Sequence, residues 1–348
     1  MAKGNTQHLT YSTQAIAEIE DRLRNKGYVA GFETHLMRWV VEELRKAPKF
    51  LMPEGGRIID SDSTFRLFDA ARLPYHCVAL EFHVRQRTVA AIDSPSSKRI
   101  ALVWDDKRHK AVAPPIEAGQ GGDQAPEDRV LHVFCLYRHD ESGMWLFSPA
   151  ISEINLDKQP ERIDIEEYSR ENEGQEQMVE IMRQRDAATG TKFSKKRWLV
   201  NQRLIPFFVS IMASMIEKMG VESASATMRA DSNDEVITAL DFAAMSGCAN
   251  VEHEEVPAPT ALNKKRSASG KPPFFPYRVL WVRDSGYEGT AGQGSTGPGG
   301  THASPRAHLR RGHIRQLEHK AIWINATVVN AGQSKLETPN YQVRKRVP

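Results

Sequence analysis

Four runs of strand-forming residues lie close together in the first half of the chain and constrain the fold most. They cover residues 76–84, 99–104, 129–137 and 144–147, and are rich in valine, leucine, isoleucine and aromatic residues. The last two runs are joined by RHDESG at residues 138–143, a sequence rich in turn formers, which predicts a β-hairpin. Such a sheet buries its apolar side chains against other elements, so helices are expected to pack on it.

Helical periodicity is present on both sides of these strands. Apolar residues recur every three or four positions in residues 13–26 and 31–46. Residues 165–187 and 191–220 are also predicted to be helical, the second stretch as the main core helix. The apolar residues 236–244 fit either a strand or a helix.

These patterns predict an α+β protein with an antiparallel sheet and covering helices. A polar, basic stretch rich in small residues and proline begins near Ala258 and marks an expected domain boundary. Residues 1–258 are predicted to form an acidic α+β domain that includes the two N-terminal helices. Residues 259–348 are predicted to form a small basic β-rich domain, with strands at 276–283 and 321–329.

The net charge of +3 conceals an uneven distribution of charge. Residues 259–348 hold 15 Lys and Arg and 4 Asp and Glu, a net charge of +11. The other 258 residues hold 32 basic and 40 acidic side chains, a net charge of −8. A basic segment on an acidic body is typical of proteins that bind a polyanion. The alternative is that the two parts are charge-complementary and dock on each other.

Cysteine usage and hydropathy predict a cytoplasmic protein. The three cysteines, Cys77, Cys135 and Cys248, are far apart and lie among apolar neighbours, which predicts reduced, buried thiols. No stretch reaches the roughly 18 apolar residues of a membrane-spanning helix. The N-terminal MAKGNTQHLT lacks the apolar segment of a secretory signal. No membrane partner is therefore expected.

Histidines and arginines are concentrated in residues 301–320, THASPRAHLRRGHIRQLEHK. This segment directly follows a loop with seven glycines in the 15 residues 286–300. Guanidinium groups match phosphate oxygens in pairs, and a histidine beside them titrates near neutral pH. The sequence therefore predicts nucleic-acid or phosphate contacts here and in a second basic cluster upstream. The predicted contact residues are Arg306, Arg310, Arg311, Arg315, Lys264, Lys265 and Arg266.

Residues 309–317 fit two conformations. As a strand they place Arg311, His313 and Arg315 on one face. As a helix they place Arg310 and His313 on one face together with Arg306. In both cases a histidine lies beside guanidinium groups.

Three functions are compatible with these features. The leading hypothesis is a nucleic-acid-binding protein whose arginines contact phosphates. The first alternative is a metal-independent ribonuclease, in which His308 and His313 act as base and acid and an arginine stabilises the charged intermediate. The second is a protein-interaction module that inhibits a host complex through the acidic body of the protein.

Neither a metal nor a cofactor is expected. The histidines of residues 301–320 are accompanied by neither paired cysteines nor an H-E-x-x-H motif, and the neighbouring arginine charges oppose a cation. A loose set of carboxylates in the first half of the chain lacks the spacing of a metal site. Its members are Asp60, Asp62, Asp69 and Glu81.

Several short motifs also carry a resemblance. They are LPYHCVALEF at 73–82, CANV at 248–251, ALNKKR at 261–266, GKPPFFPY at 270–277, GGTHASPRAHLRRGHIRQL at 299–317 and the tryptophan strand at 322–329. Together they resemble a family of uncharacterised proteins encoded in tailed-phage and prophage genomes, and HLRRGH is the most specific part. The resemblance implies a phage-type protein in a bacterial host cytoplasm. The long Gly-rich insertion before Thr301 departs from the family pattern.

Overall fold

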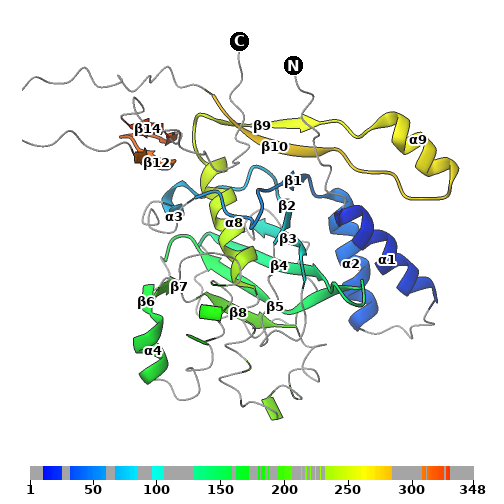
Figure 1. Cartoon of the computed structure of the whole chain (residues 1–348), viewed down its shortest axis with the longest axis horizontal. Helices are drawn as coiled ribbons and strands as arrows, with labels where there is room; N and C mark the ends of the chain where they lie inside the picture. The colour runs from blue at the N-terminus through cyan, green and yellow to red at the C-terminus, as the bar shows by residue number, and fades with distance from the viewer. Residues whose placement is uncertain are drawn as a thin grey trace, which may run out of the picture.

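The structure of the chain is a computed structural model (Figure 1). It describes residues 11–25, 32–59, 67–84, 96–105, 128–158, 162–171, 232–283, 308–310, 312–324 and 327–329, together with short stretches between 179 and 228. The expected loops at 112–124 and 286–300 lie outside the described residues.

Eight strands form one mixed sheet in the order β8-β5-β4-β3-β2-β1-β10-β9. Neighbours from β8 to β2 are antiparallel, β1 is parallel to both β2 and β10, and β9 is antiparallel to β10. The strands are β1 (Lys49–Leu51), β2 (Cys77–His83), β3 (Lys98–Asp105), β4 (Val130–Arg138), β5 (Trp145–Asn155), β8 (Asn201–Leu204), β9 (Val251–Val256) and β10 (Tyr277–Val282).

The α+β class is confirmed, but the expectation of an antiparallel sheet is wrong around β1. Residues 52–76, which include α3 (Leu67–Ala70), connect β1 to β2. A connection of this length lets two consecutive strands run parallel, whereas a short hairpin turn forces them antiparallel. The predicted hairpin does exist between β4 and β5, which pair antiparallel.

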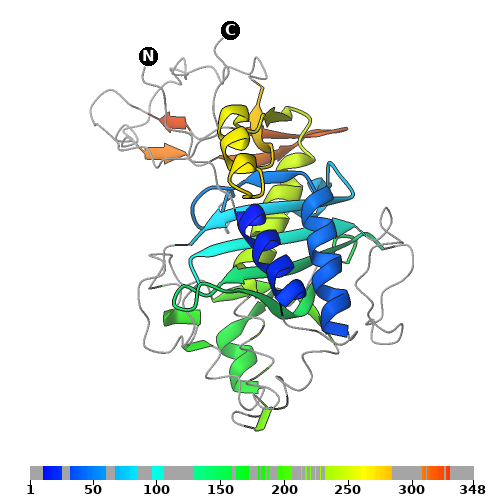
Figure 2. The same ribbon diagram turned by 90° about the vertical axis from the view of Figure 1, so that its right-hand side faces the viewer.

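Helices cover both faces of the sheet. Along β3, Ile100 and Leu102 face α1 (Tyr11–Asn25) and α2 (Phe32–Lys46), and Val103 faces α8 (Asn233–Ser246). Most residues of β2, β3 and β4 are buried because neither face of these strands meets solvent. Figure 2 shows α1 and α2 in front of the sheet and α8 behind it.

The main core helix is α8, which settles the open assignment of residues 236–244. It is buried on nearly all sides, and two buried carboxylates fix its position. Glu235 accepts a hydrogen bond from Arg99 of β3 at 2.8 Å. Asp241 accepts the backbone N–H groups of Ile58 and Ile59 at 3.0 Å each. These bonds tie the helix to the sheet and to the chain that follows β1.

The prediction of a core helix beginning at residue 191 is wrong. β7 (Lys196–Trp198) pairs with β6 (Arg162–Asp164), which leads into α4 (Ile165–Glu171). β8 pairs with β5 at one edge of the sheet. Strands of three and four residues carry too short an alternating pattern to compete with the helical spacing of the apolar residues after them.

The sheet and its core continue across the boundary expected at Ala258. β9 and β10 lie on either side of that position and pair with each other along their whole length. Ile314, Ala321 and Trp323 belong to the hydrophobic cluster that surrounds α8. β10 and the buried residues Ile314, Ala321 and Trp323 therefore share a sheet or a core with the N-terminal part of the chain.

Candidate nucleic-acid interface

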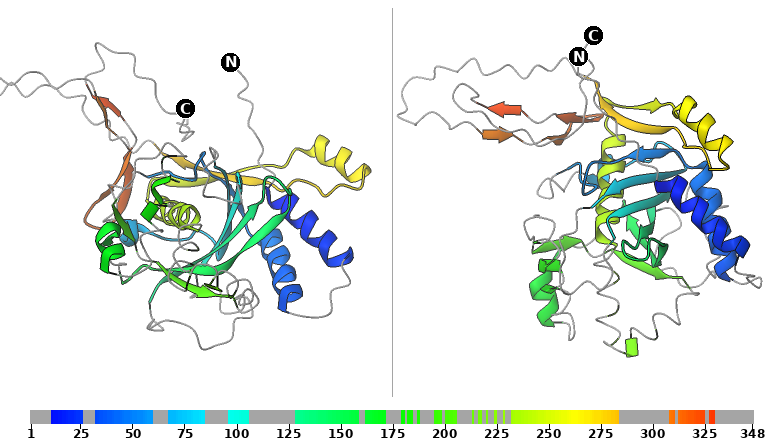
Figure 3. Two further views of the ribbon diagram at one scale, coloured as in Figure 1. Left: turned by 60° about the horizontal axis from the view of Figure 1, so that its bottom comes forward. Right: turned by 45° about the vertical axis from the view of Figure 1, so that its right-hand side comes forward.

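An arm carries α9 (Thr260–Ala268) away from the sheet. It connects β9 to β10, and Figures 1 and 3 show it projecting beyond the body, above α1 and α2 in Figure 1. Residues 257–276 of the arm carry four basic side chains and no acidic one. No residue of α9 is buried. Since most helices owe their stability to packing, this one has to be held by other contacts.

Two side chains hold α9 to the returning chain of the arm. Asn263 donates from Nδ2 to the carbonyl oxygen of Phe274 at 2.9 Å and accepts the Phe274 N–H at 2.8 Å. Arg266 donates from Nε to the carbonyl oxygen of Pro272 at 2.8 Å, and its guanidinium carbon lies 4.0 Å from the centre of the Phe274 ring. The helix ends before Gly270, whose φ of +67° lets the chain reverse.

These contacts separate the roles of the three predicted residues in the basic cluster. Arg266 is partly buried and its guanidinium is used within the arm, so it orders the arm. Lys264 and Lys265 are both exposed and can reach a phosphate. The cluster was expected at a domain boundary, and the structure places it on a helix.

The arm is fixed to the sheet through Phe275. The Nζ atom of Lys49 in β1 lies 4.0 Å from the centre of the Phe275 ring and donates to the carbonyl oxygen of Arg45 at 3.1 Å. Lys49 is 6% exposed, and burial lowers its pKa to about 8. With Glu81 and Tyr277 it lines a small cavity of about 10 Å³, which is about the space of one water molecule.

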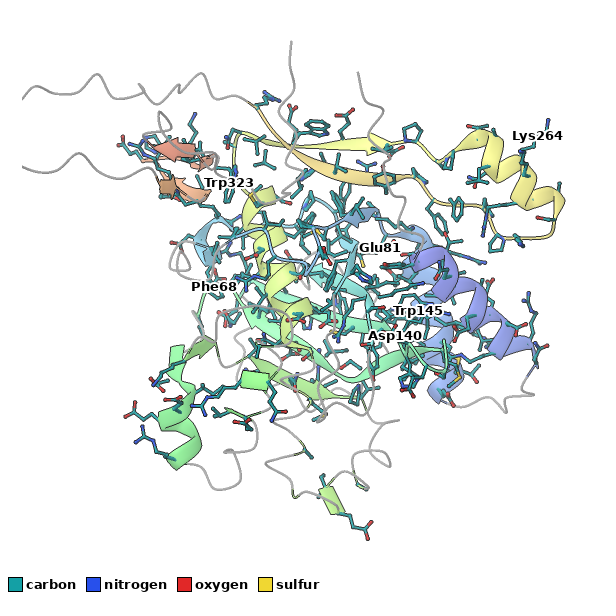
Figure 4. All side chains as sticks on the ribbon, in the orientation of Figure 1. Phe68, Glu81, Asp140, Trp145, Lys264 and Trp323 are labelled. Atoms are coloured by element: carbon teal, nitrogen blue, oxygen red, sulfur yellow. The ribbon has the colours of Figure 1, made fainter. Side chains whose placement is uncertain are left out.

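The C-terminal segment forms a β-ribbon at the other end of β9 and β10. β11 (His308–Arg310) pairs with β14 (Thr327–Val329), and β12 (His313–Gln316) pairs with β13 (Ala321–Ile324). Both pairings keep the same register, and residues 311, 325 and 326 between them lie outside the described part of the chain. Of the two conformations open for this segment, the structure shows the strand. Figure 4 shows Trp323 of this ribbon and Lys264 of α9 at opposite ends of the molecule.

The ribbon is anchored beside the end of α8. Asn250 donates from Nδ2 to the carbonyl oxygen of Trp323 at 2.9 Å and accepts the Trp323 N–H at 2.8 Å. A Cβ atom at Gly312 would lie 2.4 Å from Cζ2 of Trp323. Packing of the indole ring therefore requires the glycine of HLRRGH, and the asparagine of CANV holds the strand that carries this ring.

The structure places only part of the predicted C-terminal cluster. Arg315 is exposed and His313 partly buried, and both lie on the face of β12 opposite Ile314. Two predicted contacts, Arg306 and Arg311, lie outside the described residues. Only the backbone is described for the predicted contact Arg310 and for His308, the candidate catalytic residue of the ribonuclease alternative.

The ribonuclease hypothesis needs His308 and His313 close together. His308 is in β11 and His313 is in β12, but Arg311 between them and the side chain of His308 lie outside the described residues. A base and an acid that act on one phosphodiester must both lie within hydrogen-bond reach of it. The pairing of these two histidines therefore stays a prediction.

Acidic side chains separate the arm from the ribbon. β9 forms the edge of the sheet between them, and its Glu254 and Glu255 are exposed. Glu255 pairs with Arg278 at 2.6 Å, and Glu252 pairs with Arg283. A polyanion would therefore meet two separate basic elements at the ends of an acidic edge.

Comparisons with known proteins add no relative. No protein-family model, curated protein or solved structure matches the chain. Among the described residues, no helix has the length and apolar character needed to cross a membrane. Within that same part of the chain, no group of three or more His, Cys, Asp or Glu side chains is arranged to hold a metal ion. The three cysteines are free and buried, as predicted.

The loose set of carboxylates does not form a site in the described residues. Asp69 is exposed on α3, and Asp60 and Asp62 lie outside the described part of the chain. Glu81 is buried beneath α1, where it accepts the backbone N–H groups of Tyr11 at 3.1 Å and Ser12 at 2.9 Å. Burial raises the pKa of Glu81. A charged residue inside the apolar run CVALEFH was the available sequence signal for this buried group.

Proposed function

We propose that this protein binds nucleic acid and that the α9 arm is its main phosphate-contacting element. The observation that carries the proposal is a projecting helix with no buried residue, in an arm with four basic and no acidic side chains. Asn263 and Arg266 keep this helix folded without burying it. The arm thus holds Lys264 and Lys265 in solvent on a preformed support, which lowers the ordering cost of binding.

The charge-complementary alternative predicts ion pairs between the arm and the acidic body. In the described residues no ion pair joins Lys264, Lys265, Arg266 or Lys271 to an acidic side chain. The basic charge of the arm is therefore available to an external polyanion.

The C-terminal ribbon supplies a second contact in this proposal. Arg315 is exposed on the ribbon, and its neighbour His313 lies on the same face of β12. The predicted phosphate contacts Arg306, Arg310 and Arg311 belong to the same segment. The resemblance to proteins of tailed phages and prophages implies a bacterial host cytoplasm as the place of this binding.

The salt dependence of binding tests the proposal. Labelled duplex DNA and single-stranded RNA are titrated with the protein in EDTA over a range of salt concentrations. Each phosphate contact contributes about 0.7–0.9 to the slope of log K against log salt. The variant Lys264→Ala/Lys265→Ala is expected to bind more weakly than the wild type at low salt, with a slope reduced by about 1.4–1.8.

A matched control removes the same charge far from the arm. Lys158 and Lys195 are 57% and 61% exposed, near the end of β5 and at the start of β7. Lys158→Ala/Lys195→Ala should keep the wild-type slope. Equal losses in both variants, or a wild type that binds neither nucleic acid at low salt, would contradict the proposal. Shortened RNA strands in EDTA would instead favour the ribonuclease alternative.

A further inference from the structure

The contacts of α9 define an inner side and an outer side of the helix. Successive residues are about 100° apart around a helix axis. Asn263 and Arg266 hold the helix to the returning chain, so they mark the inner side. On the opposite side lie Ala261 and Ala268, and both are exposed.

Two lysines flank this pair of alanines. On the same spacing, Lys264 and Lys265 lie about 50° to either side of the outward direction. Their long side chains diverge, and the surface between them is formed by methyl groups. The backbone of α9 can therefore approach a ligand closely between two positive charges. To bind a flat row of phosphates, a helix needs only the two positive charges. To enter a groove that has phosphates along both rims, it also needs small side chains between those charges.

A large apolar side chain lies on the flank of the helix and not on the side of the two alanines. Leu262 is 45% exposed and lies about 110° from the outward direction, on the far side of Lys265. The surface between the two lysines is therefore formed by the alanines alone.

We propose that α9 enters the major groove of duplex DNA, with its alanines toward the base edges and its two lysines toward the phosphates of the two strands. This inference rests on the proposed function and names its ligand. A helix is about 10–12 Å across with its side chains, and the major groove of B-form DNA is about 12 Å wide. The major groove of A-form RNA is too narrow and deep to admit side chains.

The aromatic residues of the arm argue against a single strand as the ligand. Single-stranded nucleic acids bind by stacking bases on open aromatic rings. Both phenylalanines of the arm are partly buried and already have a cation over the ring: Arg266 over Phe274 and Lys49 over Phe275.

Bulky substitutions on the outer face test groove entry without changing the charge. Ala261→Trp and Ala268→Trp each place an indole where the groove floor would lie. Each is expected to weaken binding to a DNA duplex at least tenfold. Ser267→Trp adds a side chain of the same size to a lateral, exposed position of the same helix and should change affinity less than threefold. Circular dichroism and thermal unfolding verify that each variant is folded.

The ligands are a DNA duplex, an RNA duplex of the same sequence and the single DNA strand. The wild type should prefer the DNA duplex to both others by at least tenfold at equal salt. If Ala261→Trp and Ala268→Trp bind like the wild type while Lys264→Ala/Lys265→Ala does not, groove entry is wrong and the proposed function stands. Equal affinity of the wild type for the DNA and RNA duplexes would also overturn groove entry. If the wild type binds none of the three, the proposed function itself fails.

Discussion

Gly312 shows how a single residue in the C-terminal ribbon is dictated by its neighbour. A side chain at this position would collide with the ring of Trp323, which is buried and held by Asn250. We expect Gly312→Ala to lower the free energy of unfolding by about 1–3 kcal/mol, because the ring has no room to move. Trp323→Phe removes the ring atoms that the alanine would collide with. Gly312→Ala should therefore lower the free energy of unfolding less in the Trp323→Phe variant than in the wild type. A double-mutant cycle by urea unfolding measures this coupling, and purely additive effects would disprove the steric explanation.

The side chain of Asn250 bonds the backbone N–H and carbonyl oxygen of Trp323, as a neighbouring strand would. Asn250→Ala leaves a buried N–H and a buried carbonyl oxygen without this partner, which should cost about 2 kcal/mol or more. Amide hydrogen exchange of residues 313–324 should rise together, because the ribbon loses its anchor. Asn201→Ala, at an exposed position of β8, serves as the control. Unchanged exchange in the ribbon would show that the packing of Trp323 alone holds it.

At the scale of elements, the arm depends on its own side chains because α9 buries none of its residues. Asn263→Ala removes both hydrogen bonds to Phe274 and should let the helix open. Trypsin cleaves after lysine, so cleavage at Lys264 and Lys265 should accelerate about tenfold or more, while the rest of the protein keeps its thermal stability. Ser267→Ala is the matched control on the same helix. If Asn263→Ala is cleaved at the wild-type rate, the hydrogen bonds of Asn263 do not hold the helix closed.

The elements that could be predicted from the sequence are those whose apolar residues form a clear pattern within the element itself. β2, β3 and β4 are continuous apolar runs, and α1 and α2 are amphipathic, so they stand within one or two residues of their predicted bounds. β1 escaped prediction because it has three residues and begins with a lysine. β9 escaped because its sequence VEHEEV is that of a charged edge strand.

Tertiary contacts decided the rest of the candidate site. The basic residues of α9 were predicted as phosphate contacts from charge alone. Their separation into exposed lysines and an arm-ordering Arg266 depends on Phe274, which lies eight positions further along the chain. The pairing of β1 with β10 and the contact of Asn250 with Trp323 join residues far apart in sequence. No local pattern records such contacts.

At the scale of the whole molecule, two buried charges of opposite sign lie side by side where the arm, β1 and β2 meet. Lys49 and Glu81 line the same cavity. Lys49 contacts Phe275 at the base of the arm, and Glu81 accepts the first N–H groups of α1. The pair thus connects the proposed binding arm to the packing of the N-terminal helix. Its protonation should affect the stability of the whole fold.

Burial raises the pKa of Glu81 above its ordinary 4.5 and lowers that of Lys49 from 10.5 to about 8. Glu81 binds its proton more tightly in the folded chain, so its contribution to stability is largest below pH 4.5 and declines as the pH rises above that value. Lys49 binds its proton less tightly in the folded chain, so its contribution grows between pH 8 and 10.5. The pair therefore stabilises the fold least near neutral pH. The free energy of unfolding of Lys49→Met/Glu81→Gln, relative to that of the wild type, should be highest at about pH 7.5 and lower at about pH 4 and 10. Urea unfolding at the three pH values measures this difference. A difference that stays constant across the three pH values would show that neither group is perturbed.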